Sequence, residues 1–184
     1  MAEAIKLTTP LEKQDMEKLR VGDRVLLSGK IYTGRDMAHR RFLELIEKGE
    51  KLPIDLRGQI IYYVGPTPAK PGYPIGSCGP TTSYRMDKFT PTLHKMGLAA
   101  SIGKGKRSPA VREAIKEYQG VYFVATGGVA ALICKSVKSS KVIAYDDLGP
   151  EAVREMEVVD LPLTVGNDCQ GGDVFEEGVK KYGK

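Results

Sequence analysis

Tryptophan is absent from this sequence, aromatic residues are few, and no long apolar run occurs. Aromatic residues make up 7% of the chain. Without an RNP-like pattern, a zinc-finger pattern or a long basic block, this composition argues against nucleic-acid binding. No apolar run approaches the roughly 20 residues of a membrane-spanning helix. Residues 1–6 lack the hydrophobic region of a signal peptide. We therefore expect neither a membrane protein nor an exported one.

Cysteine is also scarce. The three cysteines, Cys78, Cys134 and Cys169, are far apart and odd in number, so a disulfide framework is not expected. The CxxC spacing of zinc and iron–sulfur ligands is missing, so the sequence predicts no metal ligands in this chain. Free thiols fit a reducing setting, and a cytoplasmic location is expected.

The composition that is present is that of an ordinary globular protein. The chain has 184 residues, of which 41% are hydrophobic and 28% charged, and this predicts one domain over residues 1–184 with a sizeable core. The net charge is +5 and the pI is about 9.0. A basic balance is typical of proteins that bind nucleic acid, an acidic partner or anionic substrates. With nucleic acid argued against, an anionic ligand or partner is favoured.

Strand and helix patterns alternate in the middle of the chain, while both ends are richer in strands. Strands are predicted over 24–32, 59–64, 98–102, 121–125, 137–145, 152–159 and 161–165, and helices over 37–48, 89–96, 109–118 and the tail to residue 184. This order predicts an α/β domain whose sheets are covered partly by helices and partly by another sheet.

The stretch over 72–87 concentrates small polar residues around Gly79-Pro80. Glycine lets the backbone approach a ligand closely, and proline is favoured at the first position of a helix. The pattern predicts a tight turn and a short helix that starts near Thr81. Thr82-Ser83 would lie in its first turn, where free N–H groups and hydroxyls bind an anion. Arg85 is expected to reach the same spot. The alternative is a capped helix after a glycine turn.

Two further cations follow predicted strands. Arg35 stands where a strand hands over to a helix, and ligands bind at such strand ends in α/β folds. Lys104 follows the next strand but one and lies between two glycines, which permit close approach. Plainer interpretations are a solvated arginine beside Asp36 and a solvated basic turn capped by Ser108. The GxxxxGK[ST] spacing is absent, so no P-loop is predicted.

Three segments occur in a fixed order along the chain. They are Thr33-Gly34-Arg35-Asp36-Met37-Ala38-His39, Gly79-Pro80-Thr81-Thr82-Ser83-Tyr84-Arg85-Met86-Asp87 and Lys104-Gly105-Lys106-Arg107-Ser108. As a set they resemble the β subunit of class I fumarases, a family that also covers the β subunit of L(+)-tartrate dehydratase. The chain departs from the usual pattern at Tyr84, where a small residue is common, and at Lys106, where Asn is common.

The resemblance implies a swivelling β/β/α three-layer domain, of the type that closes over the cluster domain in aconitase-like hydro-lyases. It implies reversible hydration of fumarate to (S)-malate. It also implies a [4Fe–4S] cluster whose cysteines come from a separate α subunit, so that this chain acts only in a hetero-oligomer and binds no cofactor alone. Cys78 is then a small packed residue rather than a ligand.

By the same resemblance, Thr81 is the catalytic base, assisted by an acidic residue of the partner, and Thr82 hydrogen-bonds the substrate. A C4 dicarboxylate needs two anion holders, and Arg35, Arg85 and Lys104 supply cations from three loops. Arginine grips a carboxylate with two N–H groups, whereas lysine acts as a point charge. Cations held beside the carbanion stabilise its extra charge.

Three alternatives stay open at this point. The substrate could be tartrate, since it presents a C4 diacid to the same cations. The chain could be a non-catalytic anion-binding regulatory domain. A cysteine enzyme using Cys78 would need a paired histidine, and only His39 and His94 exist. Neither histidine is placed by the sequence, and His39 is interpreted as a packed or surface residue.

Overall fold

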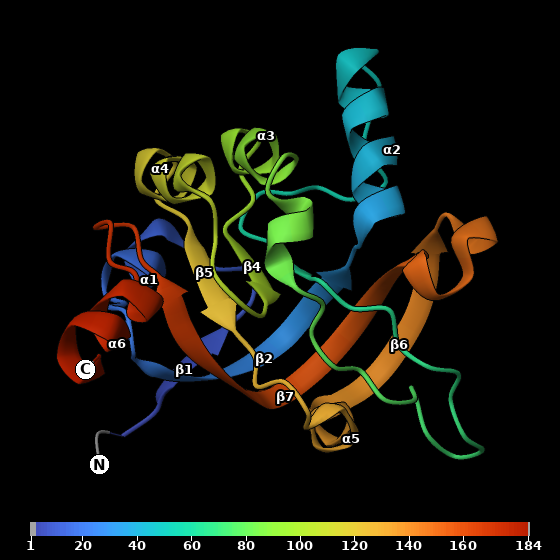
Figure 1. Cartoon of the computed structure of the whole chain (residues 1–184). Coiled ribbons are helices and arrows are strands. Elements are labelled where there is room, and N and C mark those ends of the chain that lie inside the picture. Colours follow the sequence, from blue (N-terminus) through green and yellow to red (C-terminus); the bar gives the residue numbers. More distant parts are fainter. Residues whose placement is uncertain (1–2, 184) are drawn as a thin grey trace.

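Strands and helices alternate through the middle of the chain, as the sequence predicts (Figure 1). The structure is a computed structural model that describes residues 3–183. Met1, Ala2 and Lys184 belong to the predicted 1–184 domain but lie outside the described residues. The elements are, in chain order, β1 (Ile5–Thr8), α1 (Lys13–Glu17), β2 (Arg24–Thr33), α2 (Asp36–Glu47), β3 (Ile60–Tyr62), the 3₁₀ helix η1 (Ser83–Met86), α3 (Thr90–Lys95), β4 (Ala100–Gly103), α4 (Pro109–Glu117), β5 (Val121–Val124), α5 (Ala130–Ile133), η2 (Cys134–Ser136), β6 (Val137–Ala144), η3 (Asp146–Glu151), β7 (Val153–Asn167) and α6 (Val174–Tyr182).

The strands form one mixed seven-stranded sheet in the order β1-β2-β3-β4-β5-β7-β6. Neighbours from β1 to β5 are parallel, whereas β7 runs antiparallel to β5, β6 and β2. The extra pairing of β2 with β7 closes the sheet into a circuit of β2, β3, β4, β5 and β7. The mixed α/β class is thus confirmed, whereas the second sheet that the sequence predicts is not found among the described residues, because all seven strands belong to one sheet.

Alternation of side chains along each strand separates two apolar layers. On and beside β3, Ile60 and Tyr62 point into the closed circuit, where they join residues of β2, β4, β5 and β7. Their neighbours Ile61 and Tyr63 face outward, where they pack against α2 and α3. Figure 1 shows these helices and α4 over the outer face of the parallel strands. Strand β3 is therefore packed on both faces, by the apolar cluster inside the circuit and by the cluster under α2 and α3.

Helix boundaries follow the capping signals of the sequence. Ser108 caps α4, accepting a hydrogen bond from the backbone N–H of Val111 at 3.4 Å, and Pro109 occupies the first helical position. Gly49, with φ of 69°, ends α2 in the left-handed conformation that glycine adopts freely. Across the described part of the chain, no helix combines the length and apolar character needed to cross a membrane.

Two predicted boundaries are wrong. The strands predicted over 152–159 and 161–165 are a single strand, β7, despite a positive φ at Asp160 and the missing N–H of Pro162. Pairing with β2 on both sides of this irregularity, with a register shift between Leu27 and Gly29, holds the strand together. The helix predicted to start near Thr81 is also wrong: η1 begins at Ser83, and Thr82 has an extended backbone.

Candidate functional site

Arg35 stands at the junction of β2 and α2, and His39 holds its backbone in place. Arg35 is the extended N-cap residue of α2. Its carbonyl oxygen accepts hydrogen bonds from the backbone N–H of His39 at 2.9 Å and from His39 Nδ1 at 2.8 Å. Because a carbonyl only accepts, the neutral ring carries its proton on Nδ1. One turn of helix thus fixes the residue that follows the strand.

His39 is a packed residue, as the sequence interpretation allowed. Its ring is buried against Phe42, Tyr63 and Phe89. Burial lowers the pKa of His39 to about 4, and the hydrogen bond to Arg35 opposes this only in part. The ring is therefore neutral near pH 7 and serves as a structural support rather than as a charged group.

A cluster of ion pairs joins the two arginines that the sequence singles out. Arg85 Nε donates to Asp36 Oδ1 at 3.0 Å, and Arg85 Nη2 lies 2.8 Å from Asp36 Oδ2. Arg35 Nε lies 4.0 Å from the same Asp36 Oδ2, and Arg35 Nη2 lies 3.4 Å from Glu151 Oε1. Each guanidinium has five N–H donors, so both retain donors for an external anion.

Sequence reasoning missed both carboxylates as site residues. Asp36 could have been found from its position in the first turn of α2, directly after Arg35. Glu151 gave no such signal, because only the fold brings the segment before β7 next to α2. There Glu151 also accepts a hydrogen bond from the backbone N–H of Met37 at 3.0 Å. Arg35 lies beside Asp36, as the plainer interpretation expects, but its side chain is only 23% exposed and so is not fully solvated.

The Thr81–Thr82 segment runs as an extension of the sheet instead of starting a helix. The backbone N–H of Thr81 donates to the carbonyl of Tyr63 at 2.6 Å, and its carbonyl accepts from the backbone N–H of Lys104 at 3.3 Å. The N–H of Ser83 donates to the Lys104 carbonyl at 2.9 Å. The prediction that the N–H groups of Thr81 and Ser83 are free to bind an anion is therefore wrong, because both already donate within the chain.

Lys104 lies next to Thr82 at the end of β4. The two residues form a parallel β-bridge, and a methyl group placed on Gly127 would lie 3.7 Å from Lys104 Cδ. The lysine side chain is exposed and follows the loop after β5. The structure thus brings Thr81, Thr82, Arg85, Lys104 and Arg35 to the carboxyl ends of adjacent parallel strands, and their individual roles stay predictions.

Arg107 holds these loops together. Sequence reasoning placed it in a basic turn and did not identify it as a structural residue. Its side chain is fully buried, and Arg107 Nε donates to Asp87 Oδ1 at 2.7 Å. Asp87 Oδ2 also accepts from the backbone N–H of Ser108 at 2.6 Å. Further Arg107 donors reach Ser101 and Thr90. A buried arginine pair of this kind ties the end of the Gly79–Asp87 segment to the loop that carries Lys104.

Tyr122 on β5 provides a second tie between the same loops. Its hydroxyl donates to the carbonyl of Gly105 at 2.9 Å and shares a hydrogen bond of 2.9 Å with Ser83 Oγ. Ser83 packs so closely on Gly103 that a Cβ there would overlap Ser83 Oγ at 2.0 Å. Only glycine fits at position 103, and the close approach fixes Thr82 beside Lys104.

Cys78 is a packed residue and not a nucleophile. It is fully buried, and burial raises the pKa of its thiol to about 12, so the thiol carries no charge near pH 7. Its backbone carbonyl accepts a hydrogen bond from the Tyr62 hydroxyl at 2.5 Å. The burial and the raised pKa of the Cys78 thiol argue against the alternative of a cysteine enzyme that uses Cys78. Among residues 3–183, no group of three or more His, Cys, Asp or Glu side chains could hold a metal ion.

These observations define a mixed α/β domain that presents cations and hydroxyls from the loops after parallel strands, an arrangement suited to an anionic ligand. The chain belongs to the Fumarase C-terminus family, whose model matches residues 1–178.

Relatives of two lengths match the chain. A Methanocaldococcus jannaschii protein, provisionally named L(+)-tartrate dehydratase subunit beta, is 44% identical over 177 residues, covering 93% of this chain and 91% of the relative. The Escherichia coli L(+)-tartrate dehydratase subunit beta is 33% identical, covering 96% and 89%. The anaerobic class I fumarate hydratase of E. coli is 38% identical over 185 residues, covering 97% of this chain. The chain spans 34% of the length of that fumarase.

Proposed function

We propose that this chain is the β subunit of a class I fumarate hydratase, which with an α subunit hydrates fumarate reversibly to (S)-malate. The observation that carries the proposal is the position of Arg35 after β2 and of Lys104 after β4, the two strands that flank β3, with Arg85 of η1 paired to Asp36 beside Arg35. The names of the relatives, fumarate hydratase and L(+)-tartrate dehydratase, support a hydro-lyase.

The cations suit a C4 dicarboxylate because they come from separate loops. Arg35 and Arg85, oriented by Asp36, hold one carboxylate through their free N–H groups. Lys104 adds a point charge from the end of β4, and Thr82 donates its hydroxyl. When a proton leaves the carbon beside a carboxylate, negative charge grows on that carboxylate. Cations already in place stabilise this charge more than they stabilise the ground state.

Thr81 is the proposed base at the reacting carbon. Its backbone is fixed by hydrogen bonds to Tyr63 and Lys104, so its half-buried side chain is presented from a rigid segment. A threonine hydroxyl is a weak base without a neighbour that takes its proton. We assign that neighbour to an acidic residue of the α subunit.

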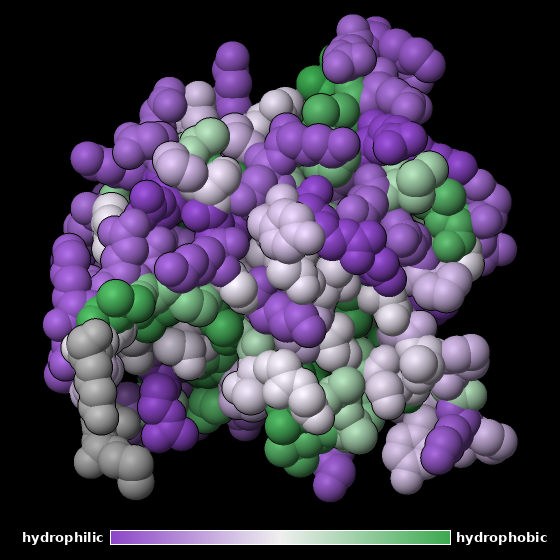
Figure 2. Space-filling view, in the orientation of Figure 1, coloured by the Kyte–Doolittle hydropathy of each residue, from purple (hydrophilic) through white to green (hydrophobic). Residues whose placement is uncertain are grey.

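Exposure of the site supports a partner that covers it. The Arg85 side chain is 41% exposed, Tyr84 is 66% exposed, and Lys104 is exposed. Figure 2 shows a hydrophobic area over α5, where Leu132 is 58% exposed. Elimination of water from a charged substrate proceeds best in an enclosed site. We propose that this domain swivels onto an α subunit whose [4Fe–4S] cluster supplies a Lewis acid for the substrate oxygens.

Tartrate is the second candidate substrate, favoured by chain length. This chain covers 91% and 89% of the two tartrate dehydratase β-subunit relatives but 34% of the single-chain fumarase. Both of these relatives are named as a separate β subunit, and this chain has nearly their length. Tartrate presents two carboxylates to the same cations, so the same site would serve it.

The test is anaerobic purification of the chain together with its α subunit, followed by assays with malate, fumarate and L(+)-tartrate. The chain alone is expected to bind no cluster after treatment with iron and sulfide, and to be inactive. Activity of the assembled complex with malate supports the fumarase proposal, and activity with tartrate alone supports the second candidate. A cluster-loaded complex inert to all three acids would overturn both, and an active, cluster-bearing isolated chain would overturn the division between subunits.

A further inference from the structure

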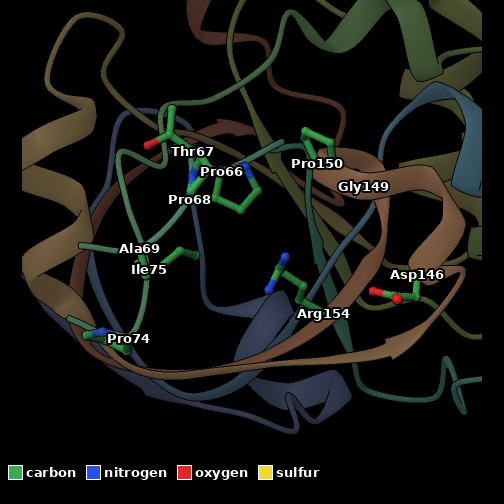
Figure 3. Close-up of a pocket in the computed structure, with 10 residues that line it drawn as sticks. All are labelled: Pro66, Thr67, Pro68, Ala69, Pro74, Ile75, Asp146, Gly149, Pro150 and Arg154. Atoms are coloured by element: carbon green, nitrogen blue, oxygen red, sulfur yellow. The ribbon is translucent and has the colours of Figure 1, made fainter. Parts of the chain in front are cut away.

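A pocket of about 290 Å³ lies beside the proline-rich loop that follows β3 (Figure 3). One wall is the loop itself, which contributes Pro66, Pro68 and Ile75. The opposite wall is the turn before β7, which contributes Pro150. In Figure 3 the side chain of Arg154 projects from β7 into the space between these walls. Stiff proline walls make this a preformed pocket rather than a gap that closes on folding.

Arg154 is the chemical group in this pocket, and its charge is not matched. Its backbone is fixed, because the N–H donates to Thr33 Oγ1 at 2.9 Å. Its Nε atom is buried and has no hydrogen-bond partner. Within residues 3–183, no carboxylate forms a salt bridge of 4.0 Å or less with its guanidinium. Arg154 as a whole is half-buried, and its buried Nε–H loses hydration without a hydrogen bond in compensation. The pocket therefore lacks an acceptor.

The surroundings indicate which anion fits. One arginine offers a planar two-pronged contact, which matches a carboxylate. The walls of proline and Ile75 offer apolar contact to a short carbon chain. Asp146 lies at the exposed rim, where its carboxylate disfavours a second negative charge on the ligand. A small monocarboxylic acid satisfies these conditions better than phosphate or a dicarboxylate does.

We propose that this pocket binds the carboxylate of a small monocarboxylic acid through Arg154. The site is separate from the cluster around Arg35. The two sites are neighbours, since a Cβ on Gly65 would lie 2.7 Å from Arg35 Nη1 and 3.2 Å from the carbonyl oxygen of Pro150, but the pocket is lined by Arg154 and not by Arg35. The proposal does not depend on the hydro-lyase function, because it concerns a different arginine and a different class of acid.

The test is a titration of the isotope-labelled full chain with butyrate, following the Nε–H resonance of Arg154 and the backbone N–H of Ile75 by NMR. Saturable shifts with a Kd of about 1–10 mM are expected for an acid of this size. In Arg154→Gln the affinity should fall at least tenfold. Arg24→Gln is the matched control, because Arg24 is exposed at the opposite end of β2. It should bind butyrate as the unchanged chain does.

A second variant covers the case in which Arg154→Gln fails to fold. Ala69→Asp changes an exposed residue that lines the same pocket as Arg154, and it adds a negative charge to the lining that repels a carboxylate ligand. Butyrate binding should be lost although the arginine is present. The proposal is overturned if no saturable shift occurs up to about 50 mM butyrate. It is equally overturned if Arg154→Gln or Ala69→Asp binds with unchanged affinity, or if Arg35→Gln abolishes binding in place of Arg154→Gln.

Discussion

At the scale of single residues, the cations of the site are held by carboxylates of the same chain. Asp36 accepts a hydrogen bond from Arg85 Nε and forms an ion pair with Arg85 Nη2, and Glu151 lies against Arg35. The guanidinium groups are therefore oriented before any ligand arrives, which lowers the entropy that binding must overcome. In the proposed complex with an α subunit, changes to these side chains should therefore alter the kinetics.

Arg85→Lys keeps the charge but loses the two-pronged contact with Asp36. We expect kcat/KM to fall about tenfold to a hundredfold, because a lysine head group is not held in the plane that a carboxylate needs. Steady-state kinetics measure the change. The thermal midpoint should hold, since the Arg85 side chain is 41% exposed. Unchanged kinetics would show that Arg85 binds no substrate.

Lys104→Met should lower kcat/KM roughly tenfold or more, because it removes the point charge at the end of β4 while keeping the apolar stem against Gly127. Lys106→Asn is the matched control: Lys106 is exposed in the same loop, and the change should be mild. Steady-state kinetics of both variants show which of the two lysines the activity depends on. If Lys106→Asn were the more damaging, the cation of this loop would be Lys106.

Thr81→Ala removes the hydroxyl of the proposed base and should lower kcat by roughly a hundredfold or more with little change in KM. Thr81→Ser keeps the hydroxyl on the same backbone and should retain most of the turnover. Both are measured by steady-state kinetics. A raised KM with an unchanged kcat in Thr81→Ala would make this residue a binding group and place the base elsewhere.

At the scale of elements, the loops of the site are joined by buried polar contacts rather than by secondary structure. Arg107→Met leaves Asp87 as an unmatched carboxylate that is only 11% exposed. We expect a loss of about 3–5 kcal/mol in the free energy of unfolding, measured with urea on the full chain. Activity should fall as well, because Asp87 also holds the backbone of Ser108.

The matched control for this prediction is Arg57→Met. Arg57 pairs with Asp55 on the surface, where its side chain is 82% exposed. Exposed pairs contribute little to stability, so no measurable loss is expected. Equal losses in the two variants would mean that the buried Arg107–Asp87 pair contributes no more to stability than the exposed Arg57–Asp55 pair does.

The elements that the sequence predicted well are those with strong local signals. The helix expected over 37–48 is observed as Asp36–Glu47, and Ser108 with Pro109 marked the start of α4. The segment around Thr81 was not predictable in this way, because its hydrogen bonds go to Tyr63 and Lys104, which no local pattern reveals. The same holds for β7, where Asp160 and Pro162 look like a break until β2 pairs across both.

The residues of the candidate site also differ in whether a local sequence signal marked them. Arg35 and Lys104 were singled out because each follows a strand, and Thr82 and Arg85 because they follow the Gly79-Pro80 turn; the resemblance added the roles of Thr81 and Thr82. Their partners within the chain were not predictable. Glu151 reaches Arg35, and Arg107 reaches Asp87, only through the folding of distant segments onto one edge of the sheet.

At the scale of the whole molecule, the two histidines make stability depend on pH. Burial lowers the pKa of both His39 and His94 to about 4, from an ordinary value of 6.5. Between these values the unfolded chain binds more protons than the folded one. Stability should therefore be complete above about pH 6.5 and fall toward pH 4, by roughly 1 kcal/mol per pH unit for each histidine.

Urea unfolding of the full chain at pH values between 4 and 7 measures this slope. In His94→Gln and His39→Gln the slope over this range should drop by about half in each case, because these are the only histidines in the sequence. The variants are less stable at every pH, so the slope and not the absolute stability is compared. A slope that is unchanged in both variants would assign the pH dependence to carboxylates.

The pairing of β2 with β7 also sets the order of events when the chain is made. Synthesis proceeds from the N-terminus, so Arg24 leaves the ribosome long before Thr164, the residue that it lies beside in the finished sheet. Until then one edge of β2 is an open row of hydrogen-bonding groups, and such edges invite pairing with other chains. The nascent protein is thus most at risk of aggregation in the interval before β7, its last strand and fifteen residues long, emerges.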